Sequence, residues 1–158
     1  MLSALAAAGL SACSQKYGTY NGPEVTSIVI NKSARKMYLL HHEEVLKEYK
    51  VDLGFAPAGP KQFRGDGKTP EGTYLIDRRN PRSSFFLSLG ISYPNSADRA
   101  YAKSKGKEPG GDIFIHGQPN NTRAKGKDWT AGCISVKDKE MSEIYAMVNV
   151  GTLITIRP

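Results

Sequence analysis

Apolar and polar residues alternate in short runs through the first third of the folded region. VTSIVI (25–30) is rich in β-branched residues, which predicts a strand. A polar turn separates it from KMYLL (36–40), and a second polar turn, HHEE (41–44), leads into VLKEYKVDL (45–53). Three short strands joined by tight polar turns favour an antiparallel meander.

Further strands are expected at GTYLID (72–77), at DIFIHG (112–117) and at the closing TLITI (152–156). The segment between the first two is rich in Pro, Gly and Ser. It predicts long loops around FFLSLGI (85–91).

One helix is clear near the C-terminal end. Asp138 is a good N-cap residue, and Gly151 lies just past the end of the pattern, where a left-handed residue often ends a helix. The apolar residues with helical spacing between them are Met141, Ile144, Tyr145 and Val148. The expected fold is mostly β (a β-rich α+β class), with this helix and at most one more.

Composition agrees with one β-rich domain and adds a basic balance. The 158 residues include 16 glycines, 9 prolines and 8 tyrosines, which favour strands and turns. The net charge is +7 and the pI about 9.4. Such a chain attracts anionic partners, but charge does not choose among nucleic acid, acidic lipid and an anionic cell-wall polymer.

The N-terminus has the character of an export signal. Residues 1–12, MLSALAAAGLSA, carry no charged side chain and are far too short to span a membrane. The usual basic start is missing. The stretch Leu10-Ser11-Ala12-Cys13 resembles the bacterial lipobox, whose cysteine is lipidated after cleavage, although a cysteine can also follow an apolar stretch by chance.

The residues that follow extend this interpretation. Ser14, directly after Cys13, resembles lipoproteins of the outer membrane of Gram-negative bacteria. We therefore predict an exported, periplasmic protein whose contact with a membrane is a lipid on Cys13. Residues 13–23 would form the lipidated cysteine and a short flexible tether.

Lipidation of Cys13 would leave Cys133 without a partner, because the chain has 2 cysteines. An unpaired thiol in an exported protein is a liability unless it is used. Chemistry at Cys133 becomes the more attractive interpretation, and a buried structural thiol or an intermolecular disulfide stays open.

Other motifs fail. GDGKT (65–69) lacks the earlier glycine of a phosphate loop, because that position is Gln62, and Pro70 interrupts the helix that should follow. The chain's 3 histidines have no paired spacing, so no metal site is expected. Nucleic-acid binding has no support beyond charge.

Cys133 and His116 form the pair that survives. An imidazole beside the thiol can accept its proton and hold the two as thiolate and imidazolium. Gly132 would let a substrate carbonyl approach, and backbone N–H groups around Gly132 and Cys133 would form an oxyanion hole. Thr130 and Trp129 in the same turn are further candidates for substrate contact, although we favour simple packing for Trp129.

Several segments together resemble the L,D-transpeptidase (YkuD-type) family. IHG (115–117) followed by DWTAGCISV (128–136) is similar to its His-Gly and Gly-Cys signature. GPKQFRGDGKTPEGTYLI (59–76) resembles its TPxG segment, and RKMYLL and GTLITIRP resemble its early and closing strands. The resemblance covers nearly all of 24–158.

This resemblance implies a β-sandwich or barrel catalytic domain over 24–158. It implies Cys133 as nucleophile, His116 as general base and the backbone carbonyl of Gly117 as the group that orients the imidazole. The implied chemistry is acyl transfer on peptidoglycan stem peptides, without metal or organic cofactor. Ala131 and Ser135 depart from the family pattern, which often has His and Arg or Asn there, so the acceptor is open.

Three functions follow: an L,D-transpeptidase, a carboxypeptidase or amidase that uses water, and a non-catalytic wall-binding lipoprotein. Residues 98–128 bear on the choice because they can either steer an anionic peptide or form an ordinary basic surface. Their charged side chains are Arg99, Lys103, Lys105, Lys107, Arg123, Lys125 and Lys127 against Asp98, Glu108, Asp112 and Asp128.

Overall fold

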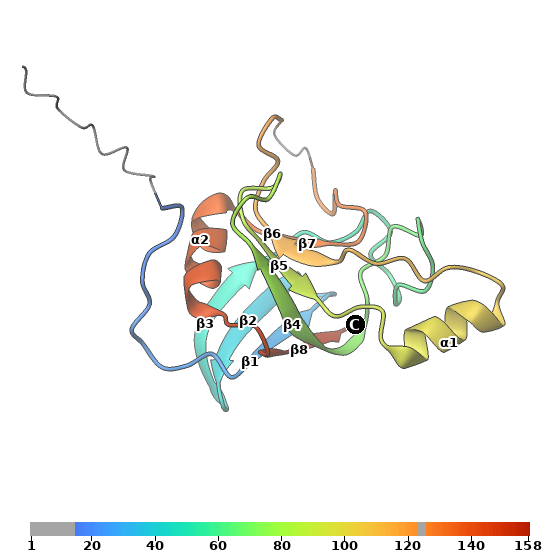
Figure 1. Ribbon diagram of the computed structural model, residues 1–158, viewed down its shortest axis with the longest axis horizontal. Coiled ribbons are helices and arrows are strands. Elements are labelled where there is room, and N and C mark those ends of the chain that lie inside the picture. Colours follow the sequence, from blue (N-terminus) through green and yellow to red (C-terminus); the bar gives the residue numbers. More distant parts are fainter. Residues whose placement is uncertain (1–14, 123–125) are drawn as a thin grey trace, which may run out of the picture.

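The computed structural model describes residues 15–122 and 126–158. The expected signal and Cys13 lie outside these residues, as do Arg123 and Lys125. The described chain forms one curled sheet in the order β3-β2-β1-β8-β4-β5-β6-β7 (Figure 1). Its strands are β1 (Ser27–Asn31), β2 (Lys36–His41), β3 (Glu44–Lys50), β4 (Gly72–Asn80), β5 (Ser88–Ile91), β6 (Phe114–His116), β7 (Ile134–Ser135) and β8 (Leu153–Arg157).

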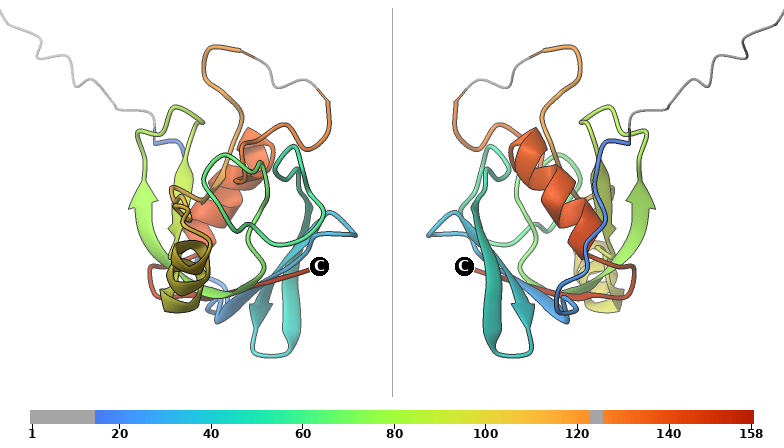
Figure 2. Two further views of the ribbon diagram at one scale, coloured as in Figure 1. Left: turned by 90° about the vertical axis from the view of Figure 1, so that its right-hand side faces the viewer. Right: turned by 90° about the vertical axis from the view of Figure 1, so that its left-hand side faces the viewer.

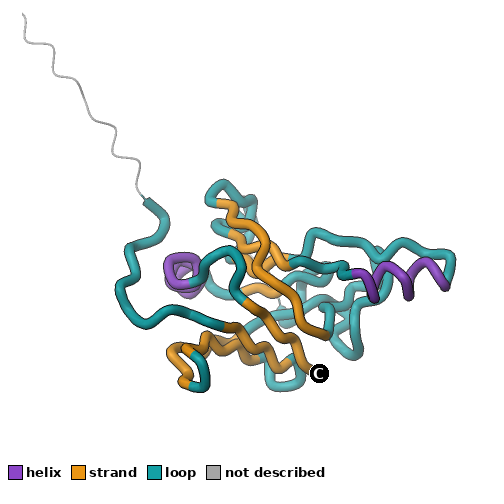
Figure 3. Tube along the Cα trace, turned by 60° about the horizontal axis from the view of Figure 1, so that its bottom comes forward, coloured by secondary structure: helices purple, strands orange, loops and turns teal. Residues whose placement is uncertain are grey.

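The expected meander is confirmed: β1, β2 and β3 pair antiparallel in sequence order. The closing strand β8 lies parallel to β1 and is itself paired antiparallel with β4. Strand β4 also pairs antiparallel with β5, with a register shift between Ile76 and Arg78. This irregularity bends β4, so the sheet curls and its two halves face each other, as the tube in Figure 3 shows.

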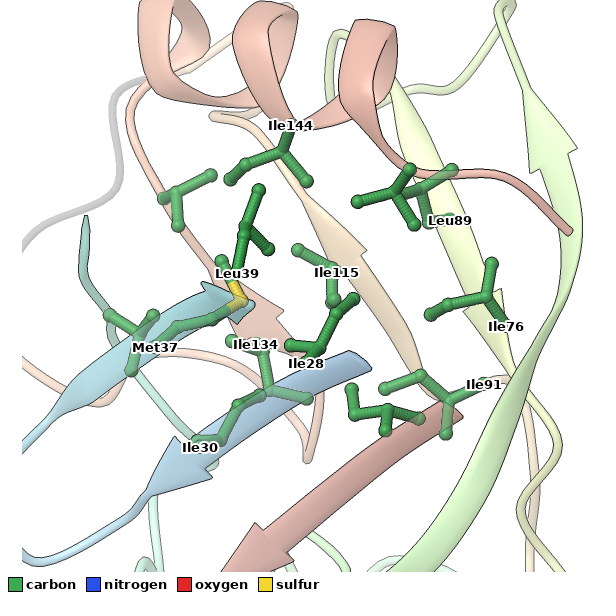
Figure 4. Close-up of a cluster of buried hydrophobic side chains, with 14 of the residues drawn as sticks. Ile28, Ile30, Met37, Leu39, Ile76, Leu89, Ile91, Ile115, Ile134 and Ile144 are labelled. Carbon is green, nitrogen blue, oxygen red and sulfur yellow. The ribbon is translucent and has the colours of Figure 1, made fainter. Parts of the chain in front are cut away.

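The core lies between the two halves of the sheet (Figure 4). Alternate residues of β1 and β2, such as Ile28 and Leu39, are fully buried and point at Ile115 and Ile134 of the other half. Ile144 of the C-terminal helix closes one side of this cluster. Burying each such side chain contributes about 1.5–3 kcal/mol. The alternation read from the sequence is therefore what turns each strand toward this core.

The expected C-terminal helix is α2 (Asp138–Met147). Its ends differ from the sequence prediction. Lys137, not Asp138, is the N-cap residue, and the Asp138 carboxylate instead accepts from the backbone N–H of Gln118 at 2.7 Å. Gly151 does have a positive φ of 94°, but the helix has already ended at Val148, which is extended. The sequence prediction placed the N-cap one residue too late, because the Asp138 carboxylate binds the loop at Gln118 and does not cap the helix.

A second helix, α1 (Ser96–Ser104), lies in a region where the sequence predicted loops. Asn95 and Asp98 cap it reciprocally, each side chain accepting from the other residue's backbone N–H at 2.9 Å. The apolar pattern of α1 is weak because Ala102 is its one buried residue. The sequence signal for this helix was therefore its capping pair, Asn95 and Asp98, and not an apolar periodicity. Figure 2 shows α1 at the far side of the molecule from the N-terminal segment.

Residues 15–23, expected to be a flexible tether, lie along α2 and the loop after β4 (Figure 2, right). The Tyr17 ring packs against Tyr145 with a centroid distance of 4.7 Å. Ser142 donates to the carbonyl of Lys16 at 2.7 Å, and the Lys16 ammonium donates to the carbonyl of Phe86 at 3.0 Å. These contacts give the segment a defined place on the domain.

Candidate active site

Of the two candidate catalytic residues, His116 ends strand β6 and Cys133 directly precedes strand β7, which is parallel to β6. In β6 and β7, Ile115 pairs with Ile134. Both isoleucines are buried in the core. Because side chains alternate along a strand, His116 and Cys133 share the opposite face of this strand pair. The parallel pairing thus brings together two residues that are far apart in the sequence.

His116 is held in one orientation. Its Nδ1 lies 2.7 Å from the carbonyl oxygen of Gly117, which can only accept, so Nδ1 carries the proton and Nε2 keeps a free lone pair. Phe85 and Trp129 pack on the ring at centroid distances of 4.5 and 5.7 Å. Burial lowers the pKa of His116, and the bond to Gly117 only partly offsets it. The imidazole is therefore uncharged at neutral pH.

Cys133 is half-buried, and its thiol donates to the carbonyl of Asp112 at 3.4 Å. Burial raises the pKa of Cys133, although the N–H of Phe114 acts in the other direction. With His116 also uncharged, the resting pair is thiol and imidazole. The expected thiolate and imidazolium are disfavoured, because both charges would sit in a desolvated site.

Both reactive groups open onto one cleft of about 330 Å³. Several of its residues are small and polar in type, but most of the surface that they present to the cleft is apolar. The lining residues are Asn80, Ser83, Ser84, Phe85, Ser88, Asp112, Phe114, His116 and Cys133. A base with a free lone pair and a solvent-accessible thiol on the same cleft are the elements of nucleophilic acyl transfer.

The turn before Cys133 is built differently from the expectation. The N–H of Gly132 donates to the Thr130 hydroxyl at 3.1 Å, and that hydroxyl donates to the Cys133 carbonyl at 2.7 Å. Gly132 has a φ of 135°, and a Cβ there would lie 2.6 Å from the carbonyl oxygen of Lys68. The glycine is required by its own backbone and by Lys68, and its N–H is engaged within the turn.

This arrangement changes the oxyanion-hole assignment. The Cys133 N–H has no hydrogen-bond partner among the described residues, whereas the Gly132 N–H already has one. Cys133 is therefore the better donor of the two. Thr130, buried at 3% exposure, shapes the turn and does not face the cleft.

A chain of polar contacts supports the carbonyl that orients His116. The Ser135 hydroxyl donates to the Gly117 carbonyl at 3.4 Å. Gln118 donates from Nε2 to Ser135 at 3.2 Å and to the Val136 carbonyl at 2.8 Å. Ser135, one of the departures from the family pattern, thus lies behind His116.

Trp129 packs beside the site. Its ring meets His116 edge-on at an interplanar angle of 66° and also lies against Phe85. Its indole Nε1 is buried and has no hydrogen-bond partner among residues 15–122 and 126–158. This placement matches the packing role favoured from the sequence.

Sequence reasoning missed Phe85 and Gln118. Phe85 was assigned to a loop, and its only sequence signal was an aromatic pair in a Ser-rich stretch. It reaches His116 because β5 pairs with β6, with Ser88 opposite His116. Gln118 follows the His-Gly pair directly, but nothing in the local pattern shows that its amide turns inward.

Two features were sought among the described residues, a cluster of metal ligands and a membrane-spanning helix. Across 15–122 and 126–158, no three His, Cys, Asp or Glu side chains converge as ligands. Neither α1 nor α2 has the length and apolar content needed to cross a membrane.

Comparison with known proteins identifies the family of this chain. The family model for YkuD, the L,D-transpeptidase catalytic domain, matches residues 26–156. The chain belongs to this L,D-transpeptidase family. YafK of Escherichia coli (strain K12), which bears the name of an L,D-transpeptidase, is 32% identical over 117 residues. That match covers 73% of this chain and 42% of YafK, so the chain spans less than half of this relative.

Solved structures share the fold of this L,D-transpeptidase domain. Pgp2 of Campylobacter jejuni, described as a helical cell shape determining protein, aligns with a TM-score of 0.65 at 24% identity, over 90% of this chain and 50% of Pgp2. Bd1075 of Bdellovibrio bacteriovorus aligns at 0.58 and 26% identity, over 84% and 48%. An L,D-transpeptidase from Mycobacterium smegmatis aligns at 0.55 and 16% identity, over 85% and 59%.

Proposed function

We propose that this chain is a cysteine acyltransferase that acts on peptidoglycan stem peptides, with Cys133 as nucleophile and His116 as general base. One observation carries the proposal. The Cys133 thiol and the His116 ring open onto the same cleft, and the Gly117 carbonyl leaves Nε2 of the imidazole as the free base. Membership in the L,D-transpeptidase family supports the substrate class.

The first half of the reaction forms a thioester. The Cys133 sulfur attacks the carbonyl of an L-centre residue of the stem while Nε2 of His116 takes the thiol proton. The negative charge that develops on the carbonyl oxygen is stabilised by the Cys133 N–H. The tetrahedral intermediate expels the terminal D-alanine, whose amine takes the proton back from the imidazolium.

The second half resolves the thioester. His116, again neutral, removes a proton from the incoming nucleophile, which attacks the thioester carbonyl. The thiolate leaves and is reprotonated by the imidazolium. An amine acceptor gives a cross-link or an exchanged terminal residue, and water gives a shortened stem. The family relationship favours an amine, and a carboxypeptidase or amidase with water is the alternative.

The test uses the soluble domain, residues 15–158, with purified disaccharide-tetrapeptide and mass spectrometry. A cross-linked dimer, or exchange of the terminal D-alanine for an added D-amino acid, supports transpeptidation. A tripeptide product alone moves the assignment to the hydrolase. An unchanged substrate with both wild-type and Cys133→Ala protein would leave the third function, a non-catalytic wall-binding protein.

The same proposal includes a location. An apolar start followed by Leu10-Ser11-Ala12-Cys13 supports export and lipidation, with anchoring to the outer membrane of a Gram-negative bacterium. Metabolic labelling with an alkyne fatty acid would mark the full chain and not its Cys13→Ala variant. By analogy with Pgp2, loss of the protein would change cell shape.

A further inference from the structure

A second cavity, of about 450 Å³, is lined at one end by residues that follow His116 and Cys133 in the sequence, among them Gln118 and Ser135. It is called the basic cavity below. Its lining includes five cationic side chains, three carboxylates and three apolar residues, and more of its surface is apolar than polar. These groups are Arg35, Lys36, Lys50, Lys127 and Lys137; Asp52, Asp128 and Glu140; and Ala34, Val51 and Val136, with Gln118 and Ser135 at the inner end.

The carboxylates of the basic cavity are already engaged. Asp128 receives two N–H groups of Arg35 and the N–H of Leu53, and these bonds outweigh burial and lower its pKa. Asp52 accepts from the N–H of Asp128 at 3.2 Å. Glu140 accepts from the N–H of Lys137 at 3.0 Å. The acids therefore serve the protein's own backbone and Arg35.

The remaining cations are not balanced in the same way. Lys50, Lys127 and Lys137 form no ion pair with any described carboxylate. Their exposed ammonium groups surround a cavity whose volume falls in the range of sites for molecules much larger than a single small anion. The apolar part of the lining suits the aliphatic portion of such a molecule.

The walls of the basic cavity are fixed by a costly local structure. Arg35 and Asp128, which form a two-pronged ion pair across 93 positions, have φ values of 51° and 49°, in the left-handed region. Ordinary side chains adopt this region only when the surroundings enforce it. Asp128 is followed directly by Trp129, which packs on His116.

The inner end of the basic cavity also reaches the catalytic base. Gln118 and Ser135 line the cavity, and Ser135 donates to the same Gly117 carbonyl that orients His116. Hydrogen bonds through Ser135 and the Gly117 carbonyl therefore connect the basic cavity to His116, which lines the catalytic cleft.

We propose that the basic cavity binds the carboxylate groups of a peptide, held by Lys50, Lys127 and Lys137. Resting on the proposed function, this peptide is the carboxylate-bearing stem that reacts at Cys133, and the basic cavity is a second point of attachment that selects acidic stems. Binding there is independent of thiol chemistry, so it is measurable in a protein that cannot react.

The experiment measures fluorescence anisotropy of dye-labelled L-Ala-γ-D-Glu-diaminopimelate-D-Ala with the Cys133→Ala domain. Adding Lys50→Gln and Lys137→Gln is expected to weaken binding about tenfold at low salt, the size of two exposed ion pairs together. The matched control adds Lys103→Gln and Lys105→Gln on α1, which removes the same charge away from the basic cavity. The same peptide with its carboxylates amidated should bind the Cys133→Ala domain as weakly as the cavity variant binds the acidic peptide.

Each outcome decides the proposal. Equal losses in the cavity and control variants would show that net charge alone attracts the peptide, and would overturn it. So would no binding by the Cys133→Ala domain, or displacement of the peptide by inorganic phosphate at matched concentration. Turnover of disaccharide-tetrapeptide by the wild-type domain is scored separately, so a failed reaction and an empty cavity are told apart.

Discussion

The meander of β1–β3 and the loops around Cys133 are held by different forces. In the meander, alternate apolar residues such as Ile28 and Leu39 are fully buried, and antiparallel backbone hydrogen bonds join the three strands. The loop 54–71, which supports the turn before Cys133, has a buried polar framework instead. Lys32 donates to the carbonyls of Gly59 and Thr69 at 2.6 and 3.0 Å and to Glu71 at 2.8 Å.

A second polar group in this loop works the same way. Burial alone would raise the pKa of Asp66, but the N–H groups of Gln62 and Phe63 and the ammonium of Lys61 outweigh it and lower that pKa. A loop without an apolar face can be fixed in this way when its carbonyls and N–H groups meet buried charges. Hydrogen bonds and ion pairs of buried polar groups therefore hold the loop that supports the site, whereas burial of apolar side chains holds the meander.

The largest effect is expected at the nucleophile. Cys133→Ser should reduce turnover by on the order of 10³ or more, because a hydroxyl does not replace the thiol and its leaving ability. The free energy of unfolding should change by less than about 1 kcal/mol, since the sulfur is not in the core. Product formation and urea unfolding, measured on one preparation, check both. Residual turnover near wild type would remove Cys133 from the mechanism.

A substitution in the core of the meander should lower stability strongly and leave turnover nearly unchanged. Ile28→Ala is expected to lower the free energy of unfolding by about 2–5 kcal/mol, because the side chain is fully buried. The rate per folded molecule should stay close to wild type. A specific loss of turnover without loss of stability would contradict the separation of the two regions.

Lys32 tests the polar framework of the loop. Lys32→Met should lower the free energy of unfolding by about 2 kcal/mol, because two carbonyls and the Glu71 carboxylate lose their donor. It should also lower turnover, since Lys68 of the same loop packs on Gly132. Lys47→Met, at an exposed ion pair of the meander outside the basic cavity, is the matched control and should change neither quantity appreciably.

The pH profile reports the burial of His116. Because burial lowers its pKa, the ascending limb of kcat/KM should lie below the ordinary imidazole value of about 6.5, with the neutral base present above it. Phe85→Ala admits water to the ring and should move this limb to higher pH. Activity should then fall more at about pH 5.5 than at about pH 8. An unmoved limb would mean that Phe85 does not desolvate the imidazole.

The smallest effect is expected at Ser135. Ser135→Ala removes one of two donors to the Gly117 carbonyl, while His116 Nδ1 remains. We expect kcat to fall by a factor of about 2–10 with KM unchanged, the size of one neutral hydrogen bond. A larger change in KM than in kcat would point to direct substrate contact instead.

The same contrast explains what the sequence could predict. The meander, β8 and α2 could be predicted from alternation and helical spacing, because their buried apolar residues recur with the period of a strand or a helix. Helix α1 was missed because Ala102 is its one buried residue, and its signal was the Asn95 and Asp98 cap. Cys133 and His116 were predicted as the catalytic pair from residue chemistry and family resemblance, and the structure places both at one cleft.

The surroundings of that pair were beyond local patterns. Phe85 on His116 depends on strand pairing, and the bond between Arg35 and Asp128 joins residues 93 positions apart. The directions of the pKa shifts of His116 and Cys133 were beyond local patterns for a related reason. Desolvation depends on what covers the pair, and adjacency in sequence does not report it.

The place of residues 15–23 on the domain has a consequence for the proposed activity. Lys16 is fixed to the loop that follows β4, and Tyr17 to α2. Under the proposed lipidation of Cys13, three peptide steps, about 10 Å at full extension, would separate the acyl chains from the folded body. The catalyst would then work flush against the bilayer, and only glycan strands lying close to that membrane would come within its range.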